Sequence, residues 1–326
     1  MADHAVDDHD DGNIFIYRGG WAPLHVTHVL IDKSVNEIEE QAHENCHNLL
    51  QVDTHDGIRK IGRYAFTGCS SLRRINLRSA VDIGREAFYD CDNLESVEFG
   101  DRLETIGYMA FCECRSLTHL KLPSIITIRG NAFDECTALI DIELSERLET
   151  VEEFAFSDCE RLQRIAIPLK RDLFAYDGVN QEYNQFGKRC VQLTTVDLVG
   201  GVHKTVASLH MESWRLEMNA EINRINQVLP NTPSYLKTDE IREWMELVID
   251  EMDHYKAEHC RYVREGITLL ELALWKAKLG EREDNCEAEG KTKNARIDTH
   301  EARKVRRITC GADIVIKNVL PFLQLE

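Results

Sequence analysis

The sequence lacks the features that direct a chain into or across a membrane. No apolar run approaches the roughly 18 residues that a membrane-spanning helix needs, so we expect no transmembrane segment. The first 13 residues contain neither a basic stretch nor an apolar core, so no secretory signal peptide is predicted. No acceptor sequence for N-linked glycosylation occurs either. These absences predict an intracellular protein, cytoplasmic or nuclear, whose cysteines stay reduced.

Basic residues are also scarce relative to acidic ones. The chain has 39 Lys and Arg against 57 Asp and Glu, which gives a formal net charge of −18. Such a surface repels phosphate backbones and anionic lipid headgroups. We therefore expect no nucleic-acid partner and no membrane partner, and we expect another protein as the partner.

The motifs of common catalytic and cofactor sites are missing as well. The sequence contains no glycine-rich phosphate loop, no nucleophile elbow, no dinucleotide fingerprint and no Cys-x-x-Cys pair. The stretch Asp7-x-His9-x-Asp11-Gly12 partly resembles a calcium loop, but it has too few oxygen ligands. We therefore predict no enzyme activity, no cofactor and no metal site.

What the sequence does contain is an internal repeat. Six segments, starting at residues 38, 61, 83, 106, 128 and 151, share the pattern I-x-x-x-A-F-x-x-C-x-x-L-x-x-I-x-L, with substitutions in the first and last copies. One cysteine marks the same point of each copy, at intervals of 23, 22, 23, 22 and 23 residues: Cys46, Cys69, Cys91, Cys114, Cys136 and Cys159. A fixed period of this length is typical of a solenoid, in which each repeat forms one coil.

The pattern predicts the interior of the coils. The apolar/polar alternation at the end of each copy predicts a short strand, and stacked coils place these strands in a parallel sheet. Equivalent positions then form columns, so we expect one buried thiol per coil, with its weak S–H donor near a backbone carbonyl. An aromatic column is expected on the opposite wall, built from Phe66, Phe88, Phe111, Phe133 and Phe156.

This pattern resembles the BspA-like leucine-rich repeat of the 23-residue type, and the likeness covers roughly residues 26–198. The resemblance implies a parallel-strand solenoid that serves as a binding or adhesion surface rather than as a catalyst.

The two ends depart from the repeat. Residues 1–13 are predicted to be a disordered acidic tail, and residues 14–37 an N-terminal cap of two strands joined through Gly19-Gly20. His43 replaces the Phe of the first copy, which predicts a smaller or wetter coil. The solenoid is expected to cover residues 38–204, as six regular coils and an irregular last coil with an insertion at 170–184.

The C-terminal third changes to a helical period. Residues 205–280 are predicted to form two striped helices, the first ended by Pro230 and Pro233 and the second running from Thr238 to a stop at Gly280. Residues 281–326 are expected to be a polar linker and a further helix. Motifs at 272–278 and 311–317 resemble the tails of predicted diatom leucine-rich-repeat proteins. This resemblance implies a similar architecture for the tail and no particular activity. The predicted fold class is therefore α+β, a leucine-rich-repeat solenoid followed by a helical hairpin or small bundle.

Strand alternation identifies the candidate binding face. Outward positions fall into two rows that vary from coil to coil, although simple solvated strand residues are the alternative interpretation. The first row is Arg74, Ser96, His119, Asp141, Arg164 and Thr195, and the second is Asn76, Glu98, Lys121, Glu143, Ala166 and Asp197.

Two further candidates lie outside these rows. The insertion carries Phe174, Tyr176 and Tyr183, which form either a functional loop or a capping excursion packed on the last coil. Cys112 occupies a slot that holds polar residues in other copies, so it is predicted to be partly exposed and the most reactive thiol. The C-terminal thiols Cys260, Cys286 and Cys310 have no predicted role.

These observations favour a non-enzymatic protein-interaction scaffold or adaptor. The alternative is a structural self-assembly unit, a homo-oligomer formed through a coiled-coil stripe on the helices at 211–279. A metal- or thiol-regulated factor ranks third.

Overall fold

The structure is a computed structural model, and it describes residues 14–174, 184–199 and 212–288. The chain divides into two compact units, Met1–Asp250 and Glu251–Glu326. The first unit contains the solenoid, and the described part of the second unit is the continuation of one long helix.

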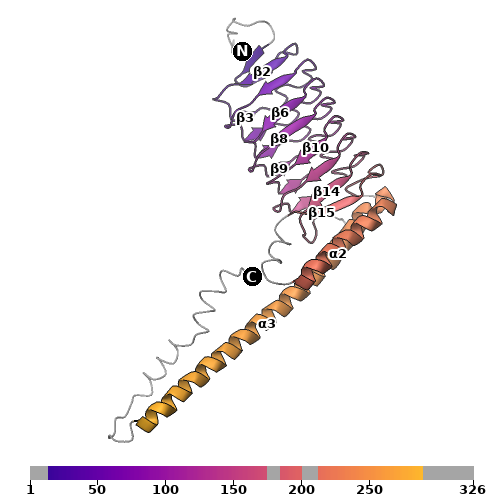
Figure 1. Cartoon of the computed structure of the whole chain (residues 1–326). Helices are drawn as coiled ribbons and strands as arrows, with labels where there is room; N and C mark the ends of the chain where they lie inside the picture. The colour runs from indigo at the N-terminus through magenta and orange to yellow at the C-terminus, as the bar shows by residue number, and fades with distance from the viewer. Residues whose placement is uncertain (1–13, 175–183, 200–211, 289–326) are drawn as a thin grey trace. The chain divides into compact units, whose positions relative to one another are not determined.

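One wall of the solenoid consists of short parallel strands stacked in chain order (Figure 1). Their outward side chains alternate with buried ones, as the repeat predicted. Two sheets make up the wall. The first holds β1 (Ile14–Tyr17), β2 (His28–Ile31), β4 (Gln51–Asp53), β6 (Arg74–Leu77) and β8 (Ser96–Phe99), and the second holds β10 (His119–Lys121), β12 (Asp141–Glu143), β14 (Arg164–Ile167) and β15 (Thr195–Leu198).

The opposite wall is a third parallel sheet of two-residue strands. Each strand contributes one buried aliphatic side chain and is followed by the turn that carries the Ala-Phe pair. The strands are β3 (Glu37–Ile38), β5 (Lys60–Ile61), β7 (Asp82–Ile83), β9 (Thr105–Ile106), β11 (Thr127–Ile128) and β13 (Thr150–Val151).

The predicted aromatic column lies between the walls. The five phenylalanines, from Phe66 to Phe156, are fully buried and stack nearly parallel, with adjacent ring centroids 4.9–5.6 Å apart. Phe186 of the irregular last coil continues the column at 6.2 Å from Phe156. Offset stacking of this kind contributes roughly 0.5–1.5 kcal/mol per pair beyond the area that it buries.

The cysteine column is confirmed too, and it has hydrogen-bond partners. From Cys69 onward, each thiol donates to the backbone carbonyl of the aromatic position one coil earlier, for example Cys91 Sγ to Phe66 O at 3.2 Å and Cys159 Sγ to Phe133 O at 3.3 Å. Cys190 keeps this contact with Phe156 O at 3.0 Å, although 31 residues rather than 22 or 23 separate it from Cys159. Burial raises the pKa of the thiols in the six regular coils, including that of Cys46 to about 11.

The N-terminal cap contains the two predicted strands, β1 and β2. They pair in parallel, so β1 extends the strand wall by one strand. The first coil is not wetter than the others, because His43 is fully buried between Tyr17 and Phe66. The His43 ring stacks on Phe66 at 4.7 Å and 6°, and neither ring nitrogen has a hydrogen-bond partner in the described structure.

The C-terminal end of the solenoid is covered by helices, which the sequence did not predict. Helix α2 (Glu212–Val228) places Asn226 beside β15, whose Val196 donates its N–H to Asn226 Oδ1 at 2.8 Å and accepts from Asn226 Nδ2 at 3.2 Å. An amide side chain thus satisfies the backbone groups that a further strand would have paired. Buried Lys237 donates from Nζ to the carbonyls of Val191 and Leu193 at 3.0 and 2.5 Å.

The helix ends follow the sequence in part. Pro230 and Pro233 do follow α2: Pro230 lies within the short 3-10 helix η1 (Leu229–Asn231), and Pro233 directly precedes a second one, η2 (Ser234–Leu236). The stop predicted at Gly280 is wrong, because α3 (Lys237–Ala288) continues through it for a total of 52 residues. One interior glycine costs a helix only about 1 kcal/mol, and the Glu, Arg and Ala residues that follow favour continuation. No described helix is long and apolar enough to cross a bilayer.

His43→Phe should stabilise the protein, and the gain should increase in acid. Burial lowers the pKa of His43 to about 3, whereas an unfolded histidine has a pKa of about 6.5. Below about pH 6.5 the unfolded state binds a proton that the folded state excludes, so the stability of the wild type falls as pH falls, by up to about 1.4 kcal/mol per pH unit. Phenylalanine cannot titrate, and it also removes two unpaired nitrogens, for which we expect a gain of roughly 1–3 kcal/mol near neutral pH.

Urea unfolding near pH 7 and near pH 5 measures this gain. The exposed neighbour His47, changed to Phe, is the matched control and should give no such gain. An equal stability difference at both pH values would contradict the assignment of His43 as a neutral buried ring.

Candidate protein-binding face

The strand register brings the predicted residues together as two outward rows. Arg74 is directly opposite Ser96, and Asp141 lies between His119 and Arg164, which in turn faces Thr195. Asn76 faces Glu98, and Lys121 faces Glu143, in the second row. Exposure decreases along the first row, from exposed side chains at Arg74, Ser96 and His119 to half-buried ones at Asp141, Arg164 and Thr195.

The first row is not continuous. The strand ladder stops between β8 and β10, so Arg74 and Ser96 belong to one sheet, and His119 and the later members belong to the next. The interruption coincides with Phe99, which stands where the neighbouring coils have Leu77 and Leu122, and which meets Phe111 edge-on at 5.8 Å. The face therefore consists of two surfaces, the first on the sheet from β1 to β8 and the second on the sheet from β10 to β15.

The first surface extends further than the sequence indicated. The first row continues through Gln51 and His28 to Ile14, and the second through Asp53 and Leu30 to Ile16. Asp53 accepts from Gln51 Nε2 at 2.7 Å and lies 2.9 Å from His28 Nε2. These hydrogen bonds lower the pKa of Asp53, with Gln51 as the larger cause. The alternation of residues 14–17 and 28–31 was the available signal for this extension.

The charges of the second surface are largely paired with one another. Arg164 donates to Asp141 at 2.7 Å and to Asp197 at 2.8 Å, and these carboxylates raise its pKa. Lys121 lies 3.2 Å from Glu143. Partly exposed pairs of this kind contribute at most about 1 kcal/mol each to stability, but they leave less charge for a partner.

Arg74 is the least committed charge of the first surface. Its side chain is 78% exposed, and it shares the single carboxylate of Glu95 with Arg73 at 3.8 Å each. A planar guanidinium with this freedom can form a bidentate contact with a partner's carboxylate. Arg74 is therefore the strongest candidate for a specific contact.

One predicted member of the rows is not available to a partner. Ala166 is buried, because its short side chain lies between the longer Glu143 and Asp197 in the strand register.

The described part of the insertion serves as a cap. Phe174 is buried, forms a parallel bridge with Val151 and meets Phe186 edge-on at 6.0 Å. Of the two interpretations of the insertion, Phe174 thus fits the capping excursion. Tyr176 and Tyr183 lie outside the described residues.

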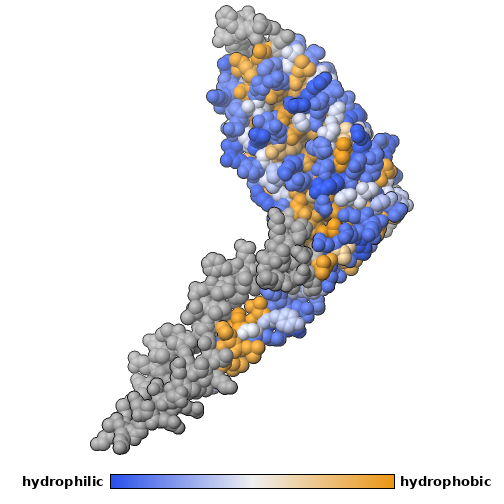
Figure 2. Space-filling view, viewed as in Figure 1, coloured by the Kyte–Doolittle hydropathy of each residue, from blue (hydrophilic) through white to orange (hydrophobic). Residues whose placement is uncertain are grey.

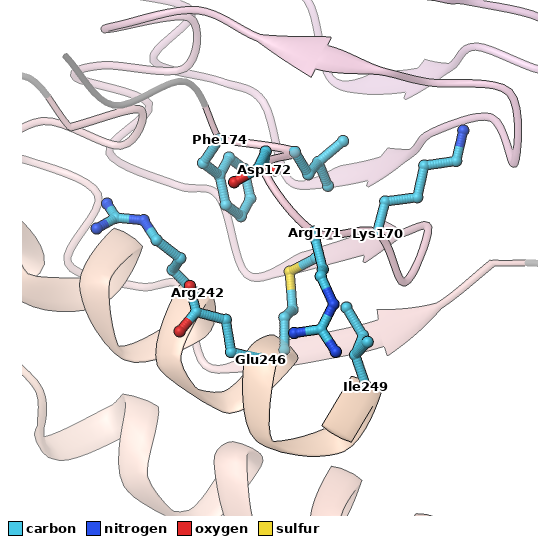
Figure 3. A pocket seen from close by; sticks show the side chains of 9 residues that line it. Lys170, Arg171, Asp172, Phe174, Arg242, Glu246 and Ile249 are labelled. Atoms are coloured by element: carbon cyan, nitrogen blue, oxygen red, sulfur yellow. The ribbon is translucent and has the colours of Figure 1, made fainter. Parts of the chain in front are cut away.

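A small hollow lies beside Phe174 (Figure 3). Its empty space of about 210 Å³ includes open solvent, so the enclosed part is smaller still than the roughly 300–1,000 Å³ of most small-molecule sites. Its rim carries charges of both signs, and the ion pair of Arg171 with Asp250, at 2.7 Å, joins the insertion to α3. The hollow is therefore a packing feature between the insertion and α3.

The prediction of an exposed Cys112 is wrong. Only 4% of the residue is exposed, and burial raises the pKa of its thiol, followed by the nearby carboxylate of Asp134. A thiol that is both covered and protonated reacts slowly. The polar side chains at this position in other coils indicated exposure, but in this coil the small sulfur is covered.

Among the described residues, no cluster of His, Cys, Asp or Glu has the geometry of a metal site. The calcium-like stretch Asp7–Gly12 lies outside the described residues.

Thiol labelling should identify Cys260 as the accessible cysteine. Cys286→Ser and Cys310→Ser first remove the two thiols whose surroundings are not described, which leaves nine free cysteines. Eight of these are buried, whereas Cys260 on α3 is half-buried. We expect Ellman's reagent to titrate one thiol in the native protein and all nine in denaturant. Adding Cys260→Ser should remove the native reaction, and adding Cys112→Ser should leave it unchanged; rapid labelling of Cys112 would contradict its burial.

Comparison with known proteins places the repeats in a family. The chain matches the BspA type leucine rich repeat region, in six copies, over residues 21–82 and 81–204. No curated protein matches the chain.

Solved structures with similar folds include three bacterial proteins. A Treponema pallidum leucine-rich repeat protein is 28% identical, over 47% of this chain and 72% of its own, with a TM-score of 0.42. A leucine-rich repeat protein from Bacteroides ovatus is 23% identical, over 59% and 70%, with a TM-score of 0.39. The pneumococcal vaccine antigen PcpA is 18% identical, over 58% and 67%, with a TM-score of 0.33. With its six matching copies and its columns of stacked Phe and Cys, this chain belongs to the BspA-type leucine-rich repeat family.

Proposed function

We propose that this chain is a non-enzymatic scaffold that binds a partner protein through the outer face of its strand wall. Repeat proteins of the BspA type are generally protein-interaction or surface-adhesion scaffolds. The specific assignment of the binding surface to the outward rows, and of the partner to an intracellular protein, is our prediction.

The observation that carries the proposal is the contrast between buried and outward positions of the same strands. Buried positions repeat similar residue types from coil to coil, while the outward positions change from Arg74 to Ser96 in one sheet, and from His119 to Asp141 in the next, without loss of register within either sheet. A rigid sheet holds these side chains in place before binding, which reduces the conformational entropy lost on association. Varied side chains on a rigid sheet suit recognition of one particular partner surface.

The partner contacts should centre on the uncommitted residues of the face. Arg74→Glu reverses a charge and His119→Glu adds one, both at exposed positions. Neither replacement breaks a short ion pair. Asp141 and Arg164 are left unchanged, because they pair with each other and their replacement would disturb the sheet. Proximity labelling of the wild type in its native cell identifies candidate partner proteins. We expect these proteins to bind the variant at least about tenfold more weakly than the wild type, a loss of about 1.4 kcal/mol in binding free energy.

The matched control places the same charge change elsewhere on the solenoid. Arg63→Glu with His47→Glu also alters two exposed residues, which lie outside the strand wall. This control should bind like the wild type. Equal binding by the face variant would show that the rows are ordinary solvated residues.

Self-assembly through the helices is a second candidate function. The early part of the stripe is occupied, because Met218, Ile225, Ile241 and Val248 are buried in the first unit. The later part of α3, which belongs to the second unit, keeps exposed leucines (Figure 2). Self-assembly is therefore a candidate function of the second unit alone.

A further inference from the structure

We propose that strand β1 is an acid-sensitive lid over His43, which detaches from the end of the solenoid when the histidine ring takes up a proton. The lid is formed by Ile14–Tyr17, and its last residue, Tyr17, lies against the ring. This inference concerns a conformational device of the fold, and it holds whether or not the strand face binds a partner.

His43 is the one histidine among the stacked rings of the described column, and its ring has no polar partner. The ring is fully buried between Tyr17, at 4.9 Å, and Phe66, at 4.7 Å, and neither nitrogen has a hydrogen-bond partner in the described structure. A proton on this ring would leave a buried charge without an acceptor, which is far more costly than the neutral ring. The proton is therefore taken up in a state in which water reaches the ring.

The titratable groups that border the ring cannot balance its charge. They are the hydroxyl of Tyr17 and the thiols of Cys46 and Cys69. Burial raises the pKa of all three, so they are neutral at pH 7 and below. Cys69 Sγ donates to the backbone carbonyl of His43 at 3.1 Å and so contributes nothing to the ring nitrogens.

The nearest described carboxylates belong to Glu37 and Glu39, and they act on Tyr17 rather than on His43. Glu37 is paired with Lys60 at 2.7 Å, and Glu39 accepts from the N–H of Gly20 at 3.0 Å. Burial is the cause of the lowered pKa of His43, with no charged neighbour to offset it.

The lid is the most weakly held strand of the described solenoid. Among the described strands, β1 has one neighbour, β2, because it forms the edge of its sheet. The opposite wall begins only at β3, so β1 and β2 lack the second strand that holds each regular coil from the other side. Elements at the end of a stack contact neighbours on one side only, and they open at lower cost than the interior.

Contacts of Tyr17 hold the lid closed in addition to the strand pairing. The N–H of Asp32 donates to the carbonyl of Tyr17 at 3.0 Å, and the N–H of Glu39 donates to its hydroxyl at 3.1 Å. The ion pair of Arg18 with Asp32, at 3.3 Å, persists in mild acid, because hydrogen bonds from Ser34 lower the pKa of Asp32 to about 2. The response to mild acid is thus assigned to His43.

Gly19 and Gly20 provide the hinge. They directly follow the lid at φ values of +120° and +78°, which residues with side chains rarely adopt. Because these two positions have no side chain, the backbone can change direction between β1 and β2. The lid can therefore leave while β2 keeps its pairing with β4.

The open and closed states bind the proton with different affinity. Burial lowers the pKa of His43 to about 3 in the closed state, whereas a solvated histidine has a pKa of about 6.5. Because the open state has the higher pKa, protons favour opening as pH falls below about 6.5. Linkage of the two equilibria raises the ratio of open to closed lids about 25-fold between pH 7 and pH 5.

Opening shortens the first surface of the strand wall. Ile14 and Ile16 leave the two outward rows, which then end at His28 and Leu30. A partner that contacts Ile16 would bind more weakly in acid. This consequence rests on the strand-face proposal, whereas the opening of the lid does not.

Hydrogen exchange of the full chain, resolved to single amides, tests the proposal at pH 7 and pH 5. The reporters are the amides of Asp32 and Glu39, whose acceptors are both on Tyr17. We expect their protection factors, corrected for the intrinsic pH dependence of exchange, to fall about 25-fold in the wild type and to stay constant in His43→Phe. The amide of Gly107, which donates to Ile83 O at 2.8 Å within the solenoid, should keep its protection in both proteins.

Two further variants separate the proton from the lid. His25→Gln removes an exposed histidine between β1 and β2, and it should retain the 25-fold change. Tyr17→Phe removes the hydroxyl that accepts from Glu39, so the Asp32 amide should be less protected at both pH values. The 25-fold change of the Asp32 amide between the two pH values should persist in Tyr17→Phe, because His43 is still present.

Three results would overturn the inference. The first is equal protection of the Asp32 and Glu39 amides at both pH values in the wild type. The second is an equal loss of protection in His43→Phe, and the third is an equal loss at Gly107, which would place the response in the whole solenoid. Partner binding that depends on Arg74 and His119 at pH 7 is independent of these results, so the two proposals fail separately.

Discussion

Stacking of identical coils is the constraint on which the rest of this structure depends. A coil of 22 or 23 residues cannot bury its own apolar side chains, so each coil forms the inner surface for the next. The same residue type must then recur at each interior position, and an aromatic ring stacks on the ring of the preceding coil. The thiol of Cys91 reaches the carbonyl of Phe66, and the same contact recurs along the ladder. The buried thiol and the carbonyl that it meets thereby satisfy each other.

The ends of the stack require different solutions because no further coil covers them. At the N-terminus, Tyr17 and the neutral ring of His43 continue the aromatic column, at the expense of two unpaired nitrogens. At the C-terminus, Asn226 and Lys237 supply hydrogen bonds to backbone groups that a further coil would have paired. Trp244 joins the two capping helices by donating to the carbonyl of Glu221 at 3.1 Å. The helices are thus part of the solenoid domain up to Asp250.

Outside the Phe and Cys columns, the fold does not dictate the residue type, so the residues there can be suited to binding a partner. Outward strand positions contribute little to stability, so the charge at Arg74 or at His119 is not dictated by the fold. The same separation applies to α3. Its first turns are held by the cap, and its later turns carry apolar side chains that packing within the described unit does not use. Binding surfaces of this protein are therefore expected where the sequence departs from its own repeat.

The sequence by itself determined the solenoid, because a short period repeated six times admits one way of burying the Phe and Cys positions. It also determined which strand residues point outward, since alternation follows from strand geometry alone. Only the tertiary structure decided the burial of Cys112 and the capping role of Phe174, because both depend on neighbours distant in sequence. The interruption between β8 and β10, the extension of the face to Ile14, and the division of the striped helices into a buried cap and an exposed patch were likewise decided by packing. A periodic pattern reports which side of a segment is apolar, but not which element covers that side, and coverage is a property of the assembled structure.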